Sequence, residues 1–292
     1  MGARIRHLLE RRLPGLIQGL TQGSIDALGL TAQPIQVSDV DAFGMSAEFV
    51  ERWQPVLARV LESYCRAEVH GLEKLPASGP AILVCNHSGV LPFDEPLLKV
   101  AVHEGTAGHR ELRPLCEDFV INAPFAGSWL NRFGLVRASQ DNAERLLRSG
   151  NLVAVFPEGA QGIGKLYRNR YQLQRFGRGG FVRLALRTQV PIYPVALVGG
   201  EESAPVLARL RLPRPLRLSH LPITPSFPLL GPLGLVPLPS RWSVQVGEAL
   251  VLPYSQKDAE DRPLVSRLTE EIREQLQQRL TGLVARRTSV FL

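Results

Sequence analysis

The sequence predicts an α/β protein with a mixed, largely parallel central sheet flanked by helices. Three observations lead to this fold class. Apolar runs of strand length alternate with helical stretches, two of these runs end in polar residues and glycine, and residues 256–292 carry an apolar stripe of helical spacing. Because 292 residues with 45% hydrophobic content are enough for one large domain, we expect a single α/β domain with appendages.

The predicted elements alternate along the chain. A helix is expected over residues 41–66, where apolar side chains from Phe49 to Leu61 recur at helical spacing. Apolar runs predict strands at 81–85, 112–116, 152–156, 192–198 and 242–246, with helices between them at 95–102, 124–133, 141–148 and 179–188. The C-terminal stretch predicts an amphipathic helix packed on the domain, because an apolar side chain recurs at every fourth position: Leu264, Leu268, Ile272, Leu276 and Leu280.

These elements divide the chain into three predicted parts. Residues 1–70 form an N-terminal helical segment that could contact a membrane, residues 71–255 form the central domain that carries the site, and residues 256–292 form the C-terminal helix. No apolar run reaches the roughly 20 residues that a membrane span requires, so we expect no transmembrane segment.

Two segments could nevertheless lie on a membrane surface. Arginines alternate with leucines and isoleucine between Arg4 and Leu16, and residues 227–239 are rich in leucine, proline and glycine. The alternatives are a helix packed on the domain and a loop that covers the core. Three separated cysteines without a Cys-x-x-Cys pair fit a reducing compartment. We therefore expect a peripheral membrane protein on the cytoplasmic face.

The net charge of +7, from 34 Lys and Arg against 27 Asp and Glu, favours anionic partners. Phosphates, acidic carrier proteins, nucleic acid and anionic lipid all satisfy that description. Nucleic acid ranks far below the others, because the chain shows no helix-turn-helix or zinc pattern and contains only 7% aromatic residues. The cysteines and histidines form no cluster of metal-ligand spacing, so no metal is expected.

His87 directly follows the predicted strand 81–85, and six residues separate it from Asp94. A neutral imidazole can take a proton from a hydroxyl group near pH 7, and a carboxylate on its other nitrogen fixes the tautomer. Gly89 and Pro92 allow a turn between the two, after which Asp94 can cap a helix and point back at the ring. Taken alone, these two residues are more often an ordinary histidine at the end of a strand and an aspartate that caps a helix.

The strand 152–156 leads into a second polar cluster, Phe156-Pro157-Glu158-Gly159. Ligands in open α/β sheets bind beyond the carboxyl ends of the strands, so we expect His87 and Glu158 to reach the same rim. The glycines that follow would let backbone amides approach a phosphate, with Lys165 nearby.

Gly159, Gly164 and Lys165 also fit the first part of a nucleotide-binding P-loop. Leu166 stands where that motif requires Ser or Thr to hold magnesium, so a P-loop enzyme is a remote alternative. A serine hydrolase is weaker still, because the chain contains no G-x-S-x-G turn.

With these motifs, residues 75–250 resemble the glycerolipid and lysophospholipid acyltransferases. The first family motif, a histidine and an aspartate after a strand, corresponds to His87 and Asp94. The second corresponds to residues 127–137, which puts Arg137 in the place of a substrate-binding arginine. The third, Phe-Pro-Glu-Gly, is residues 156–159 letter for letter, and the fourth, around Val-Pro-Ile, is residues 190–195. The first motif departs from the common spacing of four residues and is similar to a subgroup with six.

The resemblance implies transfer of a fatty acyl group from acyl-CoA or acyl carrier protein to a hydroxyl of a glycerol-based lysophospholipid. The expected acceptor is 1-acylglycerol-3-phosphate, with glycerol 3-phosphate or another lysolipid as alternatives and a catalytically inactive membrane-binding protein as a third. His87 would act as general base, held by Asp94 or by its neighbour Glu95. No acyl-enzyme and no cofactor are implied, in agreement with the absence of an activated Ser or Cys.

The resemblance, together with the position of Lys165 after the glycines, suggests substrate contacts. Arg137 and Lys165 are the expected partners of the acceptor's phosphate, and four residues are expected to position the substrate: Phe156, Pro157, Glu158 and Gly159. The expected partners of the protein are the acyl carrier, the lysophospholipid acceptor and an anionic membrane surface.

Overall fold

The computed structural model describes residues 39–89, 93–123, 126–211 and 220–291. Within these ranges, seven strands form one sheet in the order β1-β9-β6-β2-β5-β3-β4. The strands are β1 (Glu68–His70), β2 (Ala81–Cys85), β3 (Leu112–Cys116), β4 (Val136–Arg137), β5 (Leu152–Val155), β6 (Ile192–Val198) and β9 (Ser243–Val246). Neighbouring strands are parallel except β6 and β9, which are antiparallel. The predicted mixed, largely parallel sheet is confirmed.

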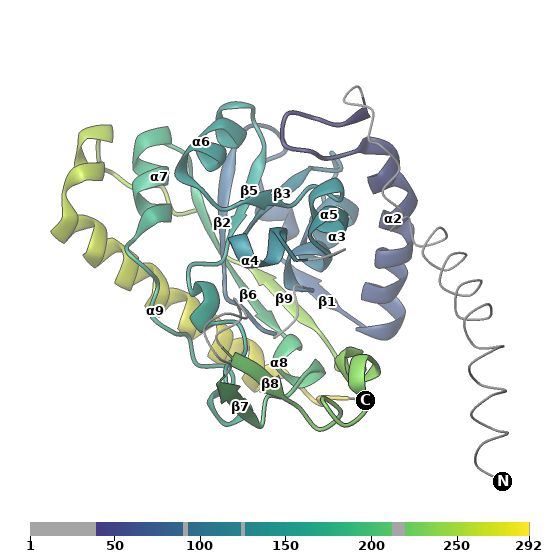
Figure 1. The fold of residues 1–292 in the computed structure, drawn as a ribbon. Coiled ribbons are helices and arrows are strands. Elements are labelled where there is room, and N and C mark those ends of the chain that lie inside the picture. Colours follow the sequence, from purple (N-terminus) through teal and green to yellow (C-terminus); the bar gives the residue numbers. More distant parts are fainter. Residues whose placement is uncertain (1–38, 90–92, 124–125, 212–219, 292) are drawn as a thin grey trace, which may run out of the picture.

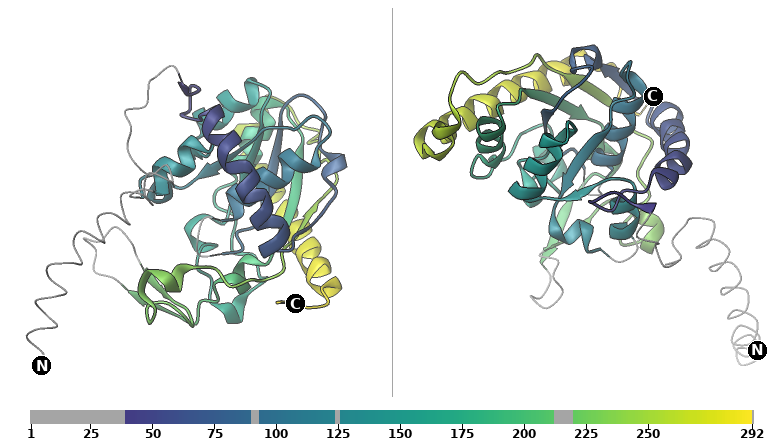
Figure 2. Two further views of the ribbon diagram at one scale, coloured as in Figure 1. Left: turned by 90° about the vertical axis from the view of Figure 1, so that its right-hand side faces the viewer. Right: turned by 90° about the horizontal axis from the view of Figure 1, so that it is seen from above.

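Helices cover both faces of this sheet (Figure 1). On one side lie α6 (Gln140–Arg148), α7 (Gly180–Thr188) and α9 (Arg262–Arg286), and on the other lie α2 (Ala47–Arg59), α3 (Asp94–Gly105) and α5 (Ala126–Arg132). The view from above shows the same arrangement, with α9 and α2 at opposite sides of the molecule (Figure 2). Short helices α4 (Asp118–Ile121) and α8 (Gly200–Ser203) connect strands of the sheet.

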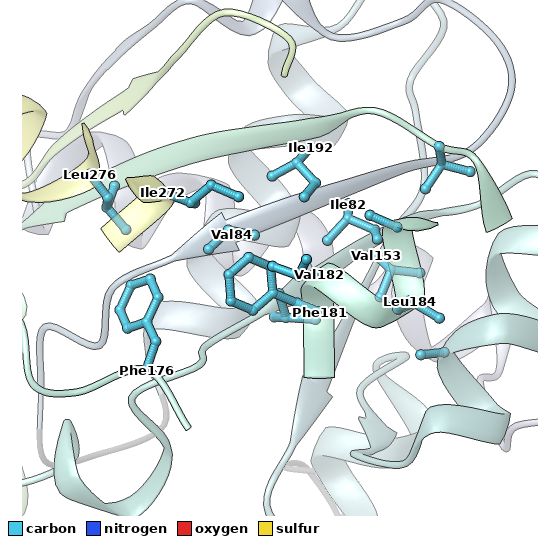
Figure 3. Packing of buried hydrophobic residues seen from close by; sticks show 14 of the residues in the cluster. Ile82, Val84, Val153, Phe176, Phe181, Val182, Leu184, Ile192, Ile272 and Leu276 are labelled. Atoms are coloured by element: carbon cyan, nitrogen blue, oxygen red, sulfur yellow. The ribbon is translucent and has the colours of Figure 1, made fainter. Parts of the chain in front are cut away.

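Side chains of β2 alternate between two apolar clusters, as the period of a strand requires. Ile82 and Val84 pack with residues of α6, α7 and α9, whereas Leu83 packs with Leu98 of α3 on the other face. Figure 3 shows the first cluster, in which Ile272 and Leu276 of α9 gather with Ile82 and Val84 of β2. All five β2 residues are buried, so the sheet holds the end of this strand, and His87 after it, in a fixed place.

Several predicted elements differ in extent. The helix expected over 41–66 is shorter: Ser46 caps α2 with its hydroxyl, and a π-helical turn from Val60 to Tyr64 follows. Asp94 is the first residue of α3 and not its N-cap, which is Phe93. The short edge strands β1 and β4 carry too few residues for an apolar alternation, and the hairpin of β7 (Ala208–Arg211) and β8 (His220–Ile223) was also not expected.

The described ranges contain no helix that is both long and apolar enough to cross a membrane. The basic N-terminal segment that was predicted to touch a membrane lies outside the described residues. Segment 227–239 lies within them, beside β7 and β8 at the lower end of Figure 1, and includes a short 3-10 helix at Gly231–Leu235.

Candidate active site

The end of β2 carries the first motif. Asn86 fixes this end to β6, because its side chain donates to the carbonyl of Leu197 and accepts from the amide of the same residue, at 2.8 and 2.7 Å. His87 follows and is buried, with its ring stacked on Phe156 at 4.6 Å between centroids. The first and third motifs are therefore in direct contact, although 68 residues of sequence lie between these two positions.

The Asp94 carboxylate faces the same loop. Its Oδ2 lies 3.5 Å from Nδ1 of His87 and accepts a hydrogen bond from the Ser88 amide at 2.8 Å. Its Oδ1 accepts from the Ser88 hydroxyl at 2.7 Å. Placed at the start of α3, the carboxylate is also favoured by the helix dipole. Asp94 therefore fixes the backbone after His87 and also occupies Nδ1, so that the other ring nitrogen, Nε2, is left for the substrate.

Glu158 is buried and bonds the backbone of His87. Its Oε1 accepts from the His87 amide at 3.0 Å and its Oε2 from the Gln174 amide at 2.7 Å. Lys165 is buried beside it, with Nζ 3.4 Å from Glu158 and 3.1 Å from Glu201. The structure thus places Glu158 behind the histidine, where its carboxylate orders the backbone of the first motif.

Two glycines make this close packing geometrically feasible. A Cβ built on Gly162 would lie 2.9 Å from the Cβ of His87 and 2.7 Å from that of Glu158. A Cβ on Gly200 would lie 2.6 Å from the Ser88 carbonyl oxygen. Any side chain at either position would push the histidine loop out of place.

The charge state of the site follows from its carboxylates. Burial lowers the pKa of His87, but the hydrogen bond to Asp94 and the nearby negative charges outweigh burial and raise it above its usual value. Burial raises the pKa of Glu95 to about 7 against the opposing charge of His87. Glu95 Oε2 has no hydrogen-bond partner among the described residues. The site therefore holds two buried groups whose pKa values are both raised above their ordinary values, as is common where acid and base chemistry takes place.

His87 and Glu95 open onto a cavity of about 370 Å³. Its wall also includes Phe156 and Pro157 of the third motif. Apolar side chains from β3, α4, α6, β5 and α7 form much of the remainder: Leu115, Val120, Ala143, Val155, Phe181 and Leu184. A buried base beside an apolar cavity is suited to activating a hydroxyl group on a hydrophobic substrate.

Parts of this chain are similar in sequence to known proteins. Residues 66–198 match the family described as Acyltransferase. An uncharacterized protein of Mycobacterium tuberculosis is 46% identical over 255 residues, which cover 86% of this chain and 71% of the relative. The chain belongs to the same family as this mycobacterial protein and carries an acyltransferase domain over residues 66–198.

Two further proteins are less similar to this chain. A human protein named DGAT1/2-independent enzyme synthesizing storage lipids is 32% identical over 130 residues, or 44% of this chain and 38% of that protein. The crystal structure of the 1-acyl-sn-glycerophosphate acyltransferase PlsC from Thermotoga maritima aligns over 98% of this chain and 99% of that chain, at 15% identity and a TM-score of 0.49.

Arg137 of the acyltransferase lies on the edge strand β4. Its Nε and a terminal nitrogen bond the two carboxylate oxygens of Asp118 at 2.6 and 2.8 Å, and both side chains are largely exposed. The next residues, Ala138 and Ser139, line the His87 cavity. Arg137 is therefore near the mouth of the cavity, and a phosphate there would have to compete with Asp118.

The amine of buried Lys165 is already engaged by protein groups and is less available to a ligand than that of an exposed lysine. Besides the two carboxylates, its amine donates to the carbonyl of Gln172 at 3.1 Å. The glycine segment before it continues into 3-10 turns at Gly159–Gln161 and Tyr167–Asn169, not into the helix that a P-loop requires. Its phosphate-binding role stays a prediction, and the observed contacts hold the third motif together.

Several residues of the site were missed from sequence. Ser88, Gln174 and Glu201 bond to Asp94, Glu158 and Lys165, and Asn86 fixes the strand end before His87 to β6. Only Asn86 and Ser88 carried a signal, because they flank His87 directly. Gln174 and Glu201 reach the site only through tertiary folding.

Proposed function

We propose that this acyltransferase moves a fatty acyl group from a thioester of coenzyme A or acyl carrier protein to a hydroxyl of a glycerol-based lysophospholipid, with 1-acylglycerol-3-phosphate as the preferred acceptor. The observation that carries the proposal is the buried His87 ring, which lines an apolar cavity while Asp94 lies at its Nδ1. This arrangement leaves Nε2 as the nitrogen for the substrate.

In the proposed mechanism, Nε2 of His87 takes the proton of the acceptor hydroxyl as its oxygen attacks the thioester carbonyl. The C–S bond then breaks, and the departing thiolate takes the proton from the imidazolium. Asp94 stabilises the imidazolium between these steps, at 3.5 Å from Nδ1. The raised pKa of His87 makes it a stronger base than a free histidine, at the cost of a smaller neutral fraction below neutral pH.

The cysteines support direct transfer without an acyl-enzyme. Cys65, Cys85 and Cys116 are all buried, and burial raises the pKa of each thiol, that of Cys65 to about 11. A thiol so far from ionisation is a poor nucleophile. The Ser88 hydroxyl donates to the Asp94 carboxylate and not to the His87 imidazole, so no histidine activates it.

The cavity supports an acyl or alkyl chain as the apolar substrate part. Its size of about 370 Å³ lies within the usual range of small-molecule sites, about 300–1,000 Å³. The side chains that form its apolar wall come from both the sheet and the covering helices, so a chain bound there would be removed from water.

A second acceptor class has support of its own. The name of the human relative describes an enzyme synthesizing storage lipids. In addition, Arg137 is already paired with Asp118, which weakens its case as a phosphate ligand. Transfer to a glycerolipid hydroxyl without a phosphate, by the same His87 chemistry, is therefore the alternative proposal.

The test is free-thiol release from acyl-CoA with a panel of acceptors: lysophosphatidate, other lysophospholipids, glycerol 3-phosphate, monoacylglycerol and diacylglycerol. His87→Ala should lower turnover by about 10²- to 10⁴-fold, the usual contribution of a general base. His70→Ala on β1 is the matched control, because His70 is exposed and on the far edge of the sheet. Near-normal turnover by His87→Ala with a folded protein would contradict the mechanism.

We also propose that the protein binds membrane surfaces peripherally. Segment 227–239 exposes four large apolar side chains by more than half: Leu229, Leu230, Leu233 and Val236. The protein itself leaves these side chains open, which favours lipid contact over the alternative of a loop that covers the core. A lipid acceptor would then reach the enzyme from the surface that holds it.

A further inference from the structure

A second cavity lies next to the first and has the opposite character. It has a volume of about 800 Å³, and five arginines line it: Arg175, Arg178, Arg183, Arg187 and Arg262. They come from the loop before α7, from α7 itself and from the start of α9. Two glutamates, Glu260 and Glu270, also line it, which leaves an excess of three positive charges (five minus two).

The two glutamates act on four of these arginines, but only Arg187 is in a close ion pair with one of them. Glu260 pairs with Arg187 at 2.6 Å, and Glu270 bonds Arg273, which is not part of the cavity wall. Within the described part of the chain, Arg175, Arg178 and Arg262 make no ion pair with a carboxylate. Guanidinium groups gathered around one cavity repel each other unless an anion binds between them.

The arginine cavity and the histidine cavity share part of their walls. Gly177, Arg178 and Gly179 line both. The amide of Gly177 donates to the Pro157 carbonyl at 3.1 Å, so the arginine loop is bonded directly to the Phe-Pro-Glu-Gly motif. Phe176 anchors the same loop in the core, with its ring edge-on to Phe181 at 6.0 Å. The position of the arginines relative to His87 is therefore fixed by packing and hydrogen bonds.

We propose that the arginine cavity binds the phosphorylated nucleotide of a coenzyme A thioester, while its acyl end enters the histidine cavity. This inference rests on the proposed acyl transfer and names its donor. A nucleotide with several phosphate groups matches several unpaired guanidinium groups, and a recessed site of about 800 Å³ suits a small molecule better than the flat contact of a carrier protein. The single phosphate of a lysophosphatidate would leave most of these arginines unpaired.

The direct test is the affinity of the full chain for adenosine 3′,5′-bisphosphate, measured by calorimetry. Arg178→Ser and Arg262→Ser should each raise Kd about tenfold, near the low end for a charge-assisted hydrogen bond. The matched control is Arg267→Ser, which removes the same charge from an exposed site on α9, outside the cavity wall and close to Glu271. Arg178→Lys should recover part of the affinity.

Kinetics then separate donor from acceptor. The same two variants should raise KM for acyl-CoA about tenfold while leaving KM for the acceptor unchanged. Arg262→Ser, which lies outside the wall of the histidine cavity, should not change kcat/KM for S-acyl-pantetheine, which lacks the nucleotide. The inference would be overturned if the variants left Kd for the bisphosphate unchanged or raised KM only for the acceptor. It would also be overturned if they lowered turnover only with acyl carrier protein as the donor. Arginine-dependent nucleotide binding by a protein without acyl transfer would contradict the proposed function and leave this site assignment standing.

Discussion

Replacing Asp94 by Asn removes one negative charge from beside His87 with almost no change in shape. The 3.5 Å between Nδ1 and Oδ2 gives the size of the effect. Opposite unit charges at that distance attract by about 5 kcal/mol at an effective dielectric constant of about 20. Because the Asn dipole and the charges of Glu95 and Glu158 remain, we expect about 3 kcal/mol of this to be lost from the imidazolium, or about 100-fold in kcat/KM.

The pH profile gives a second measure of the same change. His87 acts as a base only when neutral, so kcat/KM of the wild type should rise with pH through the raised pKa of His87. Asp94→Asn removes the hydrogen bond and a charge that raise this pKa, while burial still lowers it. The variant's profile should therefore reach its plateau at lower pH, and its deficit should be smallest in acid.

The assay is thiol release at saturating acceptor from acid to mildly alkaline pH, with circular dichroism to confirm folding. The backbone amide of Ser88 can still donate a hydrogen bond to the side-chain oxygen of Asn at position 94, so the loop should stay in place. A wild-type profile in Asp94→Asn, with unchanged rate, would refute the assignment of Asp94. If Glu95→Gln instead reproduced the rate loss and the shift, Glu95 would be the orienting group.

The remaining predictions concern stability, the acyl cavity and the membrane surface. Because burial raises the pKa of Glu95 to about 7, the folded state holds this proton more tightly than the unfolded chain and loses stability as pH rises from its ordinary value of 4.5. Glu95→Gln should therefore add about 1–3 kcal/mol to the free energy of unfolding at pH 8 and little at pH 4; an equal gain at both pH values in urea titrations would contradict this. Ala143→Phe should shift donor preference from long to medium acyl chains, because Ala143 lines the cavity and is buried, whereas an unchanged chain-length profile would place the acyl group elsewhere. Leu229→Ser with Leu233→Ser should weaken sedimentation with anionic vesicles several-fold, whereas Val251→Ser, at an equally exposed site, should not; equal loss in both would indicate nonspecific adhesion.

Most of the sheet was predictable because short apolar runs in the sequence identify its strands. Each of β2, β5 and β6 is a short apolar run that is buried throughout, and the alternation with helices indicates parallel pairing. The antiparallel placement of β9 had no such signal, since its direction depends on how the chain after β8 returns to β6. The two-residue strand β4 is defined only by its pairing with β3.

The candidate site shows the same division. Sequence alone singled out His87, Asp94 and residues 156–159, because residue types that carry chemistry stand immediately after apolar strands. It could not show that Glu158 would bond the His87 amide, or that Lys165 would be buried between two carboxylates.

What the sequence determined by itself was the class of fold and the chemistry available at the strand ends, since both depend on neighbours within a few residues. Only the tertiary structure decided which charges are compensated. Arg137 found Asp118 at 2.6 Å, whereas Arg178 and Arg262, 84 residues apart in sequence, line one cavity beside the histidine. The physical reason is that a charge is satisfied or left open by partners that long-range packing brings to it.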